Sequence, residues 1–276
     1  DDPRMPTISG MRRLGYTADS IREFCHRVSI TKRWHTAEIE LLEHCLREDL
    51  NKKSNRALAV LRPIKLVIEN YPEDQVEYLE AANNPQNSDS GTRKIPFSKE
   101  LYIEQDDFME NPPKKFFRLT VGREVRLRYG YLITCVEIIK DPTTGEVIEL
   151  RCTYDPETRG GNAPDGRKVK STIHWVSANH SINAEVRLYE RLCLDPEPDI
   201  SDRNSLETVL NPNSLEIISS AKVEPSLKEL TTGSPIQFER LGYFCLDSED
   251  SKNSNNLVFN RTVSLRDSWS KIQSQT

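Results

Sequence analysis

Two short basic runs in the middle of the chain carry the residues best suited to bind a ligand. They are Lys115–Leu119 (KFFRL) and Arg123–Tyr129 (REVRLRY). Between Asn111 and Arg128 there are six basic residues and one acidic residue, whereas residues 69–110 hold eleven acidic and three basic residues. Phosphate contact requires a local excess of positive charge, so the net charge of −5 does not exclude a nucleic-acid partner.

The second run has the alternation of a β-strand. Alternate side chains of a strand share a face, so Arg126 and Arg128 are predicted to point one way, with the aliphatic residues beside them in a core. A guanidinium offers a planar set of donors that fits phosphates and base edges. Aromatic side chains nearby could stack on unpaired bases (Phe116, Phe117 and Tyr129). Such a surface is typical of single-stranded RNA recognition, although the same alternation also keeps ordinary strands soluble.

No enzyme signature accompanies these residues. The chain has no glycine-rich phosphate loop and no G-x-S-x-G turn. The adjacent acids Asp106 and Asp107 are expected to be solvated, and His174 is expected to be a hydrogen-bonded core residue. The six cysteines and five histidines lack the spacing of a metal site, so we expect free thiols in a reducing compartment. The sequence predicts no catalytic residue and no metal site.

The composition is that of a globular chain of about two domains, at roughly 150 residues per domain. The chain has 276 residues, of which 36% are hydrophobic and 29% are charged. No run approaches the ~18 apolar residues of a membrane span, and the first residues contain no apolar signal core. A start at Asp1 rather than at methionine is expected of a fragment. We therefore expect a cytoplasmic chain with no membrane partner.

Proline divides the chain into a helical and a β-rich part. No proline lies between Pro6 and Pro63, and two amphipathic helices are predicted there, one capped by Thr17 and one by Thr36. Beyond residue 56, short β-branched runs alternate with turn residues. Strands are predicted at 57–61, 64–69, 125–127, 131–140, 147–154, 169–176, 185–192, 215–219, 236–240, 243–246 and 258–263.

The expected fold class is mainly β with an N-terminal α-helical subdomain. Many short strands with polar turns favour two β-barrels, the outer one built from strands before and after the inserted central one. The polar stretches 81–92 and 195–205 are predicted to be long loops or boundaries. The expected division is a helical subdomain over 1–55, an outer barrel from 56–110 plus 196–276, and a central barrel from 111–195.

Longer runs of sequence resemble one known family. The opening Asp1–Arg27 (DDPRMPTISGMRRLGYTADSIREFCHR) resembles the segment that follows the catalytic core of class I glutaminyl-tRNA synthetases. Further runs are similar, in order, along nearly the whole chain: REDLN (47–51), RALAV (56–60), KLVIENY (65–71), EVRLR (124–128), DGRKVK (165–170), IHWVSA (173–178), RLYERL (187–192), QFERLGYFCLDS (237–248) and FNRTVSLRD (259–267). The resemblance implies the C-terminal anticodon-binding half without the catalytic core.

The resemblance also implies an activity for the parent enzyme, which uses ATP and Mg to join glutamine to tRNA(Gln), with release of AMP and diphosphate. The ATP-binding HIGH-type and KMSKS-type motifs do not occur in this chain, so we expect it to be inactive alone and to bind no cofactor. The expected partners are tRNA(Gln) and the catalytic half of the same enzyme, with no DNA, and the chain is expected to be a monomer. The helical subdomain is implied to connect the two halves and to contact the tRNA stem. There Arg12 and Arg13 are either tRNA backbone contacts or solvated residues of a helix start.

Roles for individual base-reading residues follow from the resemblance, position by position. Arg56 and Gln237 match the pocket for the middle anticodon base, a uridine. Gln237 can pair with a pyrimidine edge through its amide, and Arg56 can donate to a carbonyl oxygen. Arg118 matches the arginine that reads the third base, a guanosine.

The remaining matches concern the first anticodon base. Arg126 and Arg128 match the arginines that hold this base and its phosphate, and Arg240 lies near the same pocket. Lys115 and Phe117 depart from the pattern of better-studied bacterial members, which have a glutamine and a lysine there. Lysine accepts no hydrogen bond, so an acceptor role at Lys115 is not expected, and Phe117 either stacks on a base or fills the barrel.

Two other interpretations stay open. Archaeal and eukaryotic glutamyl-tRNA synthetases carry related barrels, although the runs GYTADSIREFC and GYFCLDS favour the glutamine enzyme. A protein–protein scaffold would bind its partners independently of salt, whereas phosphate contacts weaken steeply as salt rises.

Overall fold

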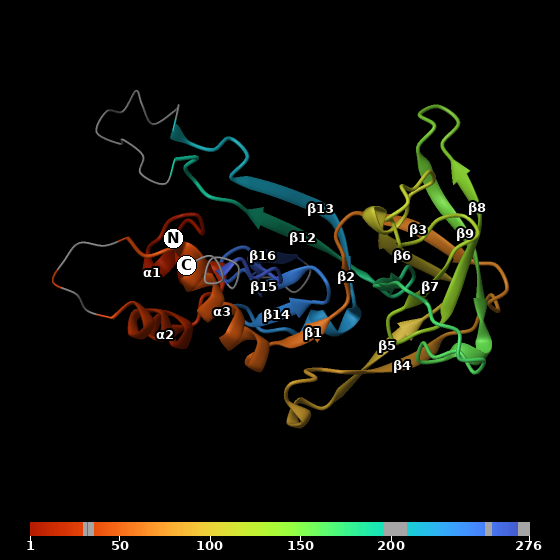
Figure 1. The fold of residues 1–276 in the computed structure, drawn as a ribbon, viewed down its shortest axis with the longest axis horizontal. Coiled ribbons are helices and arrows are strands. Elements are labelled where there is room, and N and C mark those ends of the chain that lie inside the picture. Colours follow the sequence, from red (N-terminus) through yellow and green to blue (C-terminus); the bar gives the residue numbers. More distant parts are fainter. Residues whose placement is uncertain (30–31, 33–35, 196–208, 252–255, 270–276) are drawn as a thin grey trace.

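Three helices lead into two seven-stranded sheets in the computed structural model (Figure 1). The structure describes residues 1–29, 32, 36–195, 209–251 and 256–269. The predicted fold class, mainly β with an N-terminal helical subdomain, is confirmed. Within the described ranges, no helix combines the length and the apolar content needed to cross a bilayer.

The helical subdomain consists of α1 (Ile8–Leu14), α2 (Ala18–Val28) and α3 (Ile39–Lys53). The predicted cap of α2 is confirmed, because the Thr17 hydroxyl accepts a hydrogen bond from the backbone of Ser20. The predicted cap of α3 is wrong. That helix begins at Ile39, after Glu38, and not after Thr36. Helix α1 was not predicted, because it is too short to show a clear helical periodicity in the sequence.

Helix α3 attaches the helical subdomain to the first sheet. Its residues Leu46 and Leu50 are fully buried and pack against Tyr243 and Val263 of the neighbouring strands. Figure 1 shows α3 lying between α2 and the sheet. The helical subdomain is therefore docked by apolar contact.

The outer sheet takes its strands from both ends of the β-rich region. Their order is β1 (Asn55–Ala57), β14 (Pro235–Phe238), β15 (Gly242–Leu246), β16 (Leu257–Ser264), β12 (Ile182–Tyr189), β13 (Leu215–Val223) and β2 (Ala59–Val60). The strands β1 and β2 lie at opposite edges, yet only Leu58 separates them in the chain. The two edges must therefore meet, and the sheet curls into a barrel.

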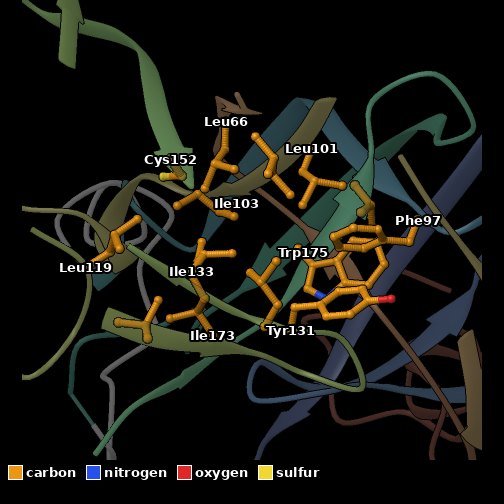
Figure 2. Close-up of a cluster of buried hydrophobic side chains, with 14 of the residues drawn as sticks. Leu66, Phe97, Leu101, Ile103, Leu119, Tyr131, Ile133, Cys152, Ile173 and Trp175 are labelled. Atoms are coloured by element: carbon orange, nitrogen blue, oxygen red, sulfur yellow. The ribbon is translucent and has the colours of Figure 1, made fainter. Parts of the chain in front are cut away.

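In the central sheet, too, a single residue joins the two edge strands. Its order is β10 (Thr172–Ile173), β7 (Glu124–Leu127), β8 (Leu132–Lys140), β9 (Val147–Asp155), β3 (Pro63–Ile68), β6 (Glu100–Glu104) and β11 (Trp175–Ser177). Here His174 alone separates the two edge strands. Inside the barrel, Phe97 packs against Trp175 and Tyr131, with ring centroids 5.1 and 5.3 Å away (Figure 2). A separate hairpin of β4 (Glu77–Ala82) and β5 (Thr92–Phe97) supplies Phe97.

The predicted barrel boundaries at 110/111 and 195/196 are wrong as limits of the two sheets. Apart from the separate β4–β5 hairpin, strands between residues 63 and 177 form the central sheet, and strands within 55–60 and 182–264 form the outer one. The chain crosses at Leu61 and Arg62, whose N–H groups donate to the Glu104 carboxylate over 2.6 and 3.0 Å. No polar stretch marks this crossing in the sequence. The predicted barrel boundaries relied on such stretches and therefore missed it.

The structure describes only one of the two polar stretches that were predicted to be loops or boundaries. Of the predicted loop 81–92, only the middle part is a loop, because Ala81 and Ala82 end β4 and Thr92 begins β5. The stretch 195–205 lies outside the described residues, apart from Asp195. Strands β4 to β6 were missed because they run through an acidic segment of low β propensity.

Replacing the confirmed cap tests the helical part of the fold. Thr17 accepts from Ser20 N over 3.1 Å and donates to Asp49 over 2.6 Å. We expect Thr17→Ala to lower the free energy of unfolding by about 1–2 kcal/mol, because an N-cap bond is lost. Urea unfolding followed by far-UV circular dichroism measures this loss. Thr36→Ala is the matched control and should be close to neutral; equal losses in the two variants would contradict the cap assignment.

Candidate nucleic-acid interface

Four consecutive residues, Gln237–Arg240, join the two barrels. The first two end β14, and the Phe238 side chain is buried in the outer barrel. Glu239 and Arg240 form the turn into β15, where the Glu239 N–H donates to the Ala57 carbonyl and Arg240 has a positive φ of 70°. The turn residues Glu239 and Arg240 contact the central barrel, whereas Gln237 lies beside Arg56 within the outer sheet.

Arg56 and Gln237 lie side by side, as predicted. They are register partners on the parallel strands β1 and β14. Arg56 Nη2 donates to Asn51 Oδ1 over 3.1 Å, and the Tyr243 hydroxyl donates to the same oxygen over 3.3 Å. Burial raises the pKa of Tyr243, against the opposing effects of the Gln237 amide and the Arg56 charge. An amide and a guanidinium are therefore presented together at the end of α3.

Glu239 gathers positive charge from the central barrel. It is only 3% exposed and forms ion pairs with Arg128 and, over 3.4 Å, with Arg93. The Tyr129 hydroxyl donates to it over 2.7 Å, and the guanidinium of Arg128 stands 5.0 Å from the centre of the Tyr129 ring. Burial acts to lower the pKa of Arg128, but the charges of Glu239 and Tyr129 outweigh it and raise that pKa. Arg128 is thus held in place before any ligand arrives.

Asp107 plays the complementary part from the central barrel. It is 2% exposed, and both its oxygens accept from Arg240, over 2.6 and 2.8 Å. Arg118 approaches the same carboxylate, with Nε 3.4 Å away, and donates to the Asp106 carbonyl over 2.9 Å. The prediction that Asp107 is solvated is therefore wrong. A cavity of about 150 Å³ lies among these residues.

His174 completes this cluster, and its prediction as a hydrogen-bonded core residue is confirmed. It is 1% exposed, its Nδ1 lies 2.8 Å from Arg240 Nη1, and its Nε2 lies 3.4 Å from Glu104 Oε1. A guanidinium can only donate, so Nδ1 is the acceptor and Nε2 carries the hydrogen that faces Glu104. The imidazole that links the edge strands of the central barrel also touches the turn of the outer one.

Arg126 lies under a different loop from Arg128, although the two were predicted to share a face. Val125 and Leu127 are fully buried, so the predicted alternation is confirmed. The backbone of Gly161, in the loop over residues 156–171, approaches so closely that a Cβ there would stand 2.6 Å from Arg126 Cδ. The buried Nε of Arg126 has no hydrogen-bond partner in the described structure. Arg126 and Arg128 therefore follow the same strand but contact different loops.

Lys115 lies on an exposed loop before β7. This loop and Ser171 line an open cavity of about 650 Å³, together with Phe116, Phe117 and Arg118. Arg123 donates to the carbonyl of Phe116 and so fixes the loop from below. Lys115 and Arg118 thus line the same cavity.

The two helical candidates differ from each other. Arg12 is exposed on α1, and its side chain has no ion pair with any described residue. Arg13 instead donates to Asp247 and Asp250, each over 3.0 Å, and thereby anchors α1 to the outer barrel. A free phosphate-binding role for Arg13 is therefore not what this arrangement favours.

Sequence reasoning missed the carboxylates that hold the arginines and one arginine that holds a loop. Arg167 donates to Glu124, Asp155 and Asp165, and pins the loop over 156–171 to the central barrel. The signal available was the pairing of acids with nearby bases in EVRLR and QFER. Since the paired residues Asp107 and Arg240 are 133 positions apart, the sequence alone did not connect them.

The fold is that of a protein with two barrel-shaped sheets, and the arginine, lysine and aromatic side chains near their junction are the groups with which β-rich proteins bind RNA. A family model described as "tRNA synthetases class I (E and Q), anti-codon binding domain" matches residues 54–155, and another with the same description matches residues 172–247. The chain belongs to this family of class I tRNA synthetases.

Curated relatives agree with the family models. The chain is 56% identical over 272 residues to the Glutamine--tRNA ligase of Nitrobacter hamburgensis, covering 99% of this chain and 48% of that protein. It is 50% identical over 269 residues to that of Clostridium kluyveri, covering 98% and 48%. For Vibrio campbellii the identity is 51% over 275 residues, covering 100% and 49%. The chain thus spans about half the length of the curated relatives it matches.

Removing the Asp107 carboxylate tests whether the junction depends on it. We expect Asp107→Ala to lower the free energy of unfolding by about 3 kcal/mol, because Arg240 loses its buried partner. Its neighbour Asp106 is exposed, so Asp106→Ala provides a matched control with an expected change within ~0.5 kcal/mol. Urea denaturation of both variants gives the comparison. Similar losses at the two positions would show that the carboxylate does not support the junction.

Acid should loosen the anchor of α1. The pKa of Asp247 is below its ordinary value of 3.8, because hydrogen bonds from the Asp250 backbone, Asn260 and Arg13 outweigh its burial. A carboxylate with a lowered pKa stabilises the fold above its ordinary pKa, and this contribution is lost as pH falls through the lowered value. We expect the stability difference between wild type and Asp247→Asn to be largest near neutral pH and to shrink below about pH 4. Urea midpoints across this range measure it, and a pH-independent difference would contradict the assignment.

Proposed function

We propose that this chain recognises the anticodon loop of tRNA(Gln) as the non-catalytic, C-terminal part of a glutamine–tRNA ligase. The observation that carries the proposal is the position of the predicted base-reading residues. All of them outside the helices fall within the two ranges that match anticodon-binding domains, at or beside the barrel junction. The relatives named Glutamine--tRNA ligase support glutamine over glutamate as the cognate amino acid.

The pair of Arg56 and Gln237 is proposed to take the middle base, a uridine. The amide of Gln237 can donate and accept at once, which suits the N3–H and a carbonyl oxygen of uracil. Arg56 Nη1 has no hydrogen-bond partner among the described residues, so Arg56 keeps a donor for a second carbonyl oxygen. The hydrogen bond that fixes Arg56 to Asn51 of α3 supports a preformed pocket.

Arg118 is proposed to read the third base, a guanosine. Its side chain is 46% exposed, and its Nη2 has no hydrogen-bond partner among the described residues. Guanine presents two acceptors, O6 and N7, which match the parallel donors of a guanidinium. Arg240 binds the same Asp107 carboxylate, so its proposed role is to position Arg118.

At the first base, Arg126 is the proposed donor and Arg128 the proposed support. The guanidinium of Arg128 is already paired with the buried Glu239 carboxylate, whereas Arg126 forms no ion pair with a described residue. Removing Arg128 would leave Glu239 with fewer cations, so a binding loss there would include a structural contribution. Lys115, exposed beside Arg118, is proposed to contact phosphate.

The remaining expectations concern the parent enzyme. We propose that ATP and Mg bind the catalytic half, that this chain binds no cofactor, and that the enzyme works in the cytoplasm as a monomer. The reaction would consume ATP, L-glutamine and tRNA(Gln) and yield glutaminyl-tRNA, AMP and diphosphate. If this chain alone catalysed ATP–pyrophosphate exchange, the proposal that it is non-catalytic would be wrong.

The test compares two anticodon stem-loops that differ at the third base. Wild-type chain should bind the guanosine RNA about 10- to 100-fold more tightly than the cytidine RNA, because cytosine offers a donor where guanine offers acceptors. Arg118→Ala should weaken binding of the guanosine RNA by about 1–3 kcal/mol and abolish the preference. Fluorescence anisotropy at fixed moderate salt measures both affinities, since phosphate contacts vary with salt.

Arg22→Ala is the charge-matched control. Arg22 lies on α2, its side chain is 77% exposed, and its ion pair with Asp19 is on the surface. This variant should keep the base preference. Equal binding of the two RNAs by wild-type chain would overturn anticodon recognition.

A further inference from the structure

Phe117 is an aromatic side chain that the fold leaves half uncovered. Its residue is 50% exposed, although it follows the half-buried Phe116 and precedes the fully buried Leu119 by two positions. The ammonium group of Lys170 lies 5.2 Å from the ring centroid. We propose that Phe117, backed by Lys170, is a stacking platform for one unpaired base of the bound RNA.

The surroundings of the ring fit a nucleotide. The cavity of about 650 Å³ beside it is within the range of small-ligand sites, roughly 300–1,000 Å³. Phe117 and Phe116 supply apolar surface there, and Lys115 and Arg118 supply positive charge, against the single carboxylate of Asp106. An apolar ring face next to cations complements a base joined to phosphates.

Two lysines beside the platform are open to phosphate. Lys115 lines the cavity and Lys170 lies at the ring, and neither forms an ion pair with another described residue. The chain as a whole is acidic, so this local charge is not a general property of its surface. A neutral apolar peptide would gain little from these lysines, which favours a polyanion as the occupant.

Both loops are held rigid before the ligand arrives. Arg123 donates to the Phe116 carbonyl, and Arg118 donates to the Asp106 carbonyl over 2.9 Å. On the other side, Arg167 binds Glu124 over 2.9 Å and Asp155 over 2.5 Å. Ordering cost is thereby removed from binding, which strengthens a stacking contact.

The other two aromatic candidates are already occupied. Phe116 is half-buried beneath the loop. Tyr129 has the guanidinium groups of Arg128 and Arg93 at 5.0 and 5.9 Å from its ring centre, and its hydroxyl is bound to Glu239. Of the three aromatic residues singled out in the basic runs, Phe117 is the most exposed, and a single cation, Lys170, lies at its ring.

This inference rests on the proposed function, since it names a further contact for the same RNA. The test uses the whole chain and the guanosine stem-loop. Phe117→Ala should weaken binding about tenfold or more, Phe117→Leu should lose nearly as much, and Phe117→Trp should bind at least as tightly as wild type, because stacking needs a π surface rather than apolar area. Thermal unfolding should be unchanged, as the ring is half exposed.

A cycle with modified RNA locates the base. Each loop nucleotide is replaced in turn by an abasic one, and affinity is measured for wild type and Phe117→Ala. At one position the abasic loss seen with wild type should vanish in Phe117→Ala, since both changes remove the same stack. Lys170→Ala should also weaken binding of the guanosine stem-loop. Lys222→Ala is its control and should not, because Lys222 lies 5.5 Å from the Tyr102 ring in a similar pair elsewhere.

The outcomes separate the two proposals. Additive losses at every loop position, or full affinity in Phe117→Ala with Arg118→Ala impaired, would overturn the platform and leave anticodon recognition standing. Loss of binding equal in Phe117→Leu and Phe117→Trp would also overturn it. No preference between the guanosine and cytidine RNAs in wild type would instead overturn the proposed function.

Discussion

Two buried carboxylates fix the barrels relative to each other. Glu239 comes from the outer barrel and binds Arg128 of the central one, while Asp107 comes from the central segment and binds Arg240 of the outer one. Glu239 and Arg240 are neighbours in a single turn, so each barrel contributes one carboxylate and one arginine to the two ion pairs. A buried carboxylate without its partner costs several kcal/mol, so neither barrel can rotate away without that loss.

The same pairs determine which arginines are already engaged within the protein. Arg128 and Arg240 bind the two carboxylates, and those carboxylates also bind the Tyr129 hydroxyl and Arg118. Arg56 and Arg126 form no ion pair with a described residue. Arginines that look equivalent in the sequence therefore differ in how far the fold has already engaged them.

Sequence reasoning reached the fold class, the alternation at 125–128 and the pairing of Arg56 with Gln237. It missed what depends on distant contacts. The barrels close because single residues, Leu58 and His174, join opposite edges, and no local pattern marks such a residue. Asp107 looked solvated beside Asp106, since neighbouring acids in a sequence do not reveal which one faces an arginine of another barrel.

Calorimetry of one double variant tests most directly whether the two carboxylate–arginine pairs couple the barrels. Wild-type chain should show both barrels unfolding in a single heat-absorption peak, with equal calorimetric and van't Hoff enthalpies for that transition. Asp107→Asn combined with Glu239→Gln should split the peak, because the barrels lose the charges that couple them. A double variant that still unfolds in one peak with equal enthalpies would contradict the claim that these carboxylates lock the barrels together.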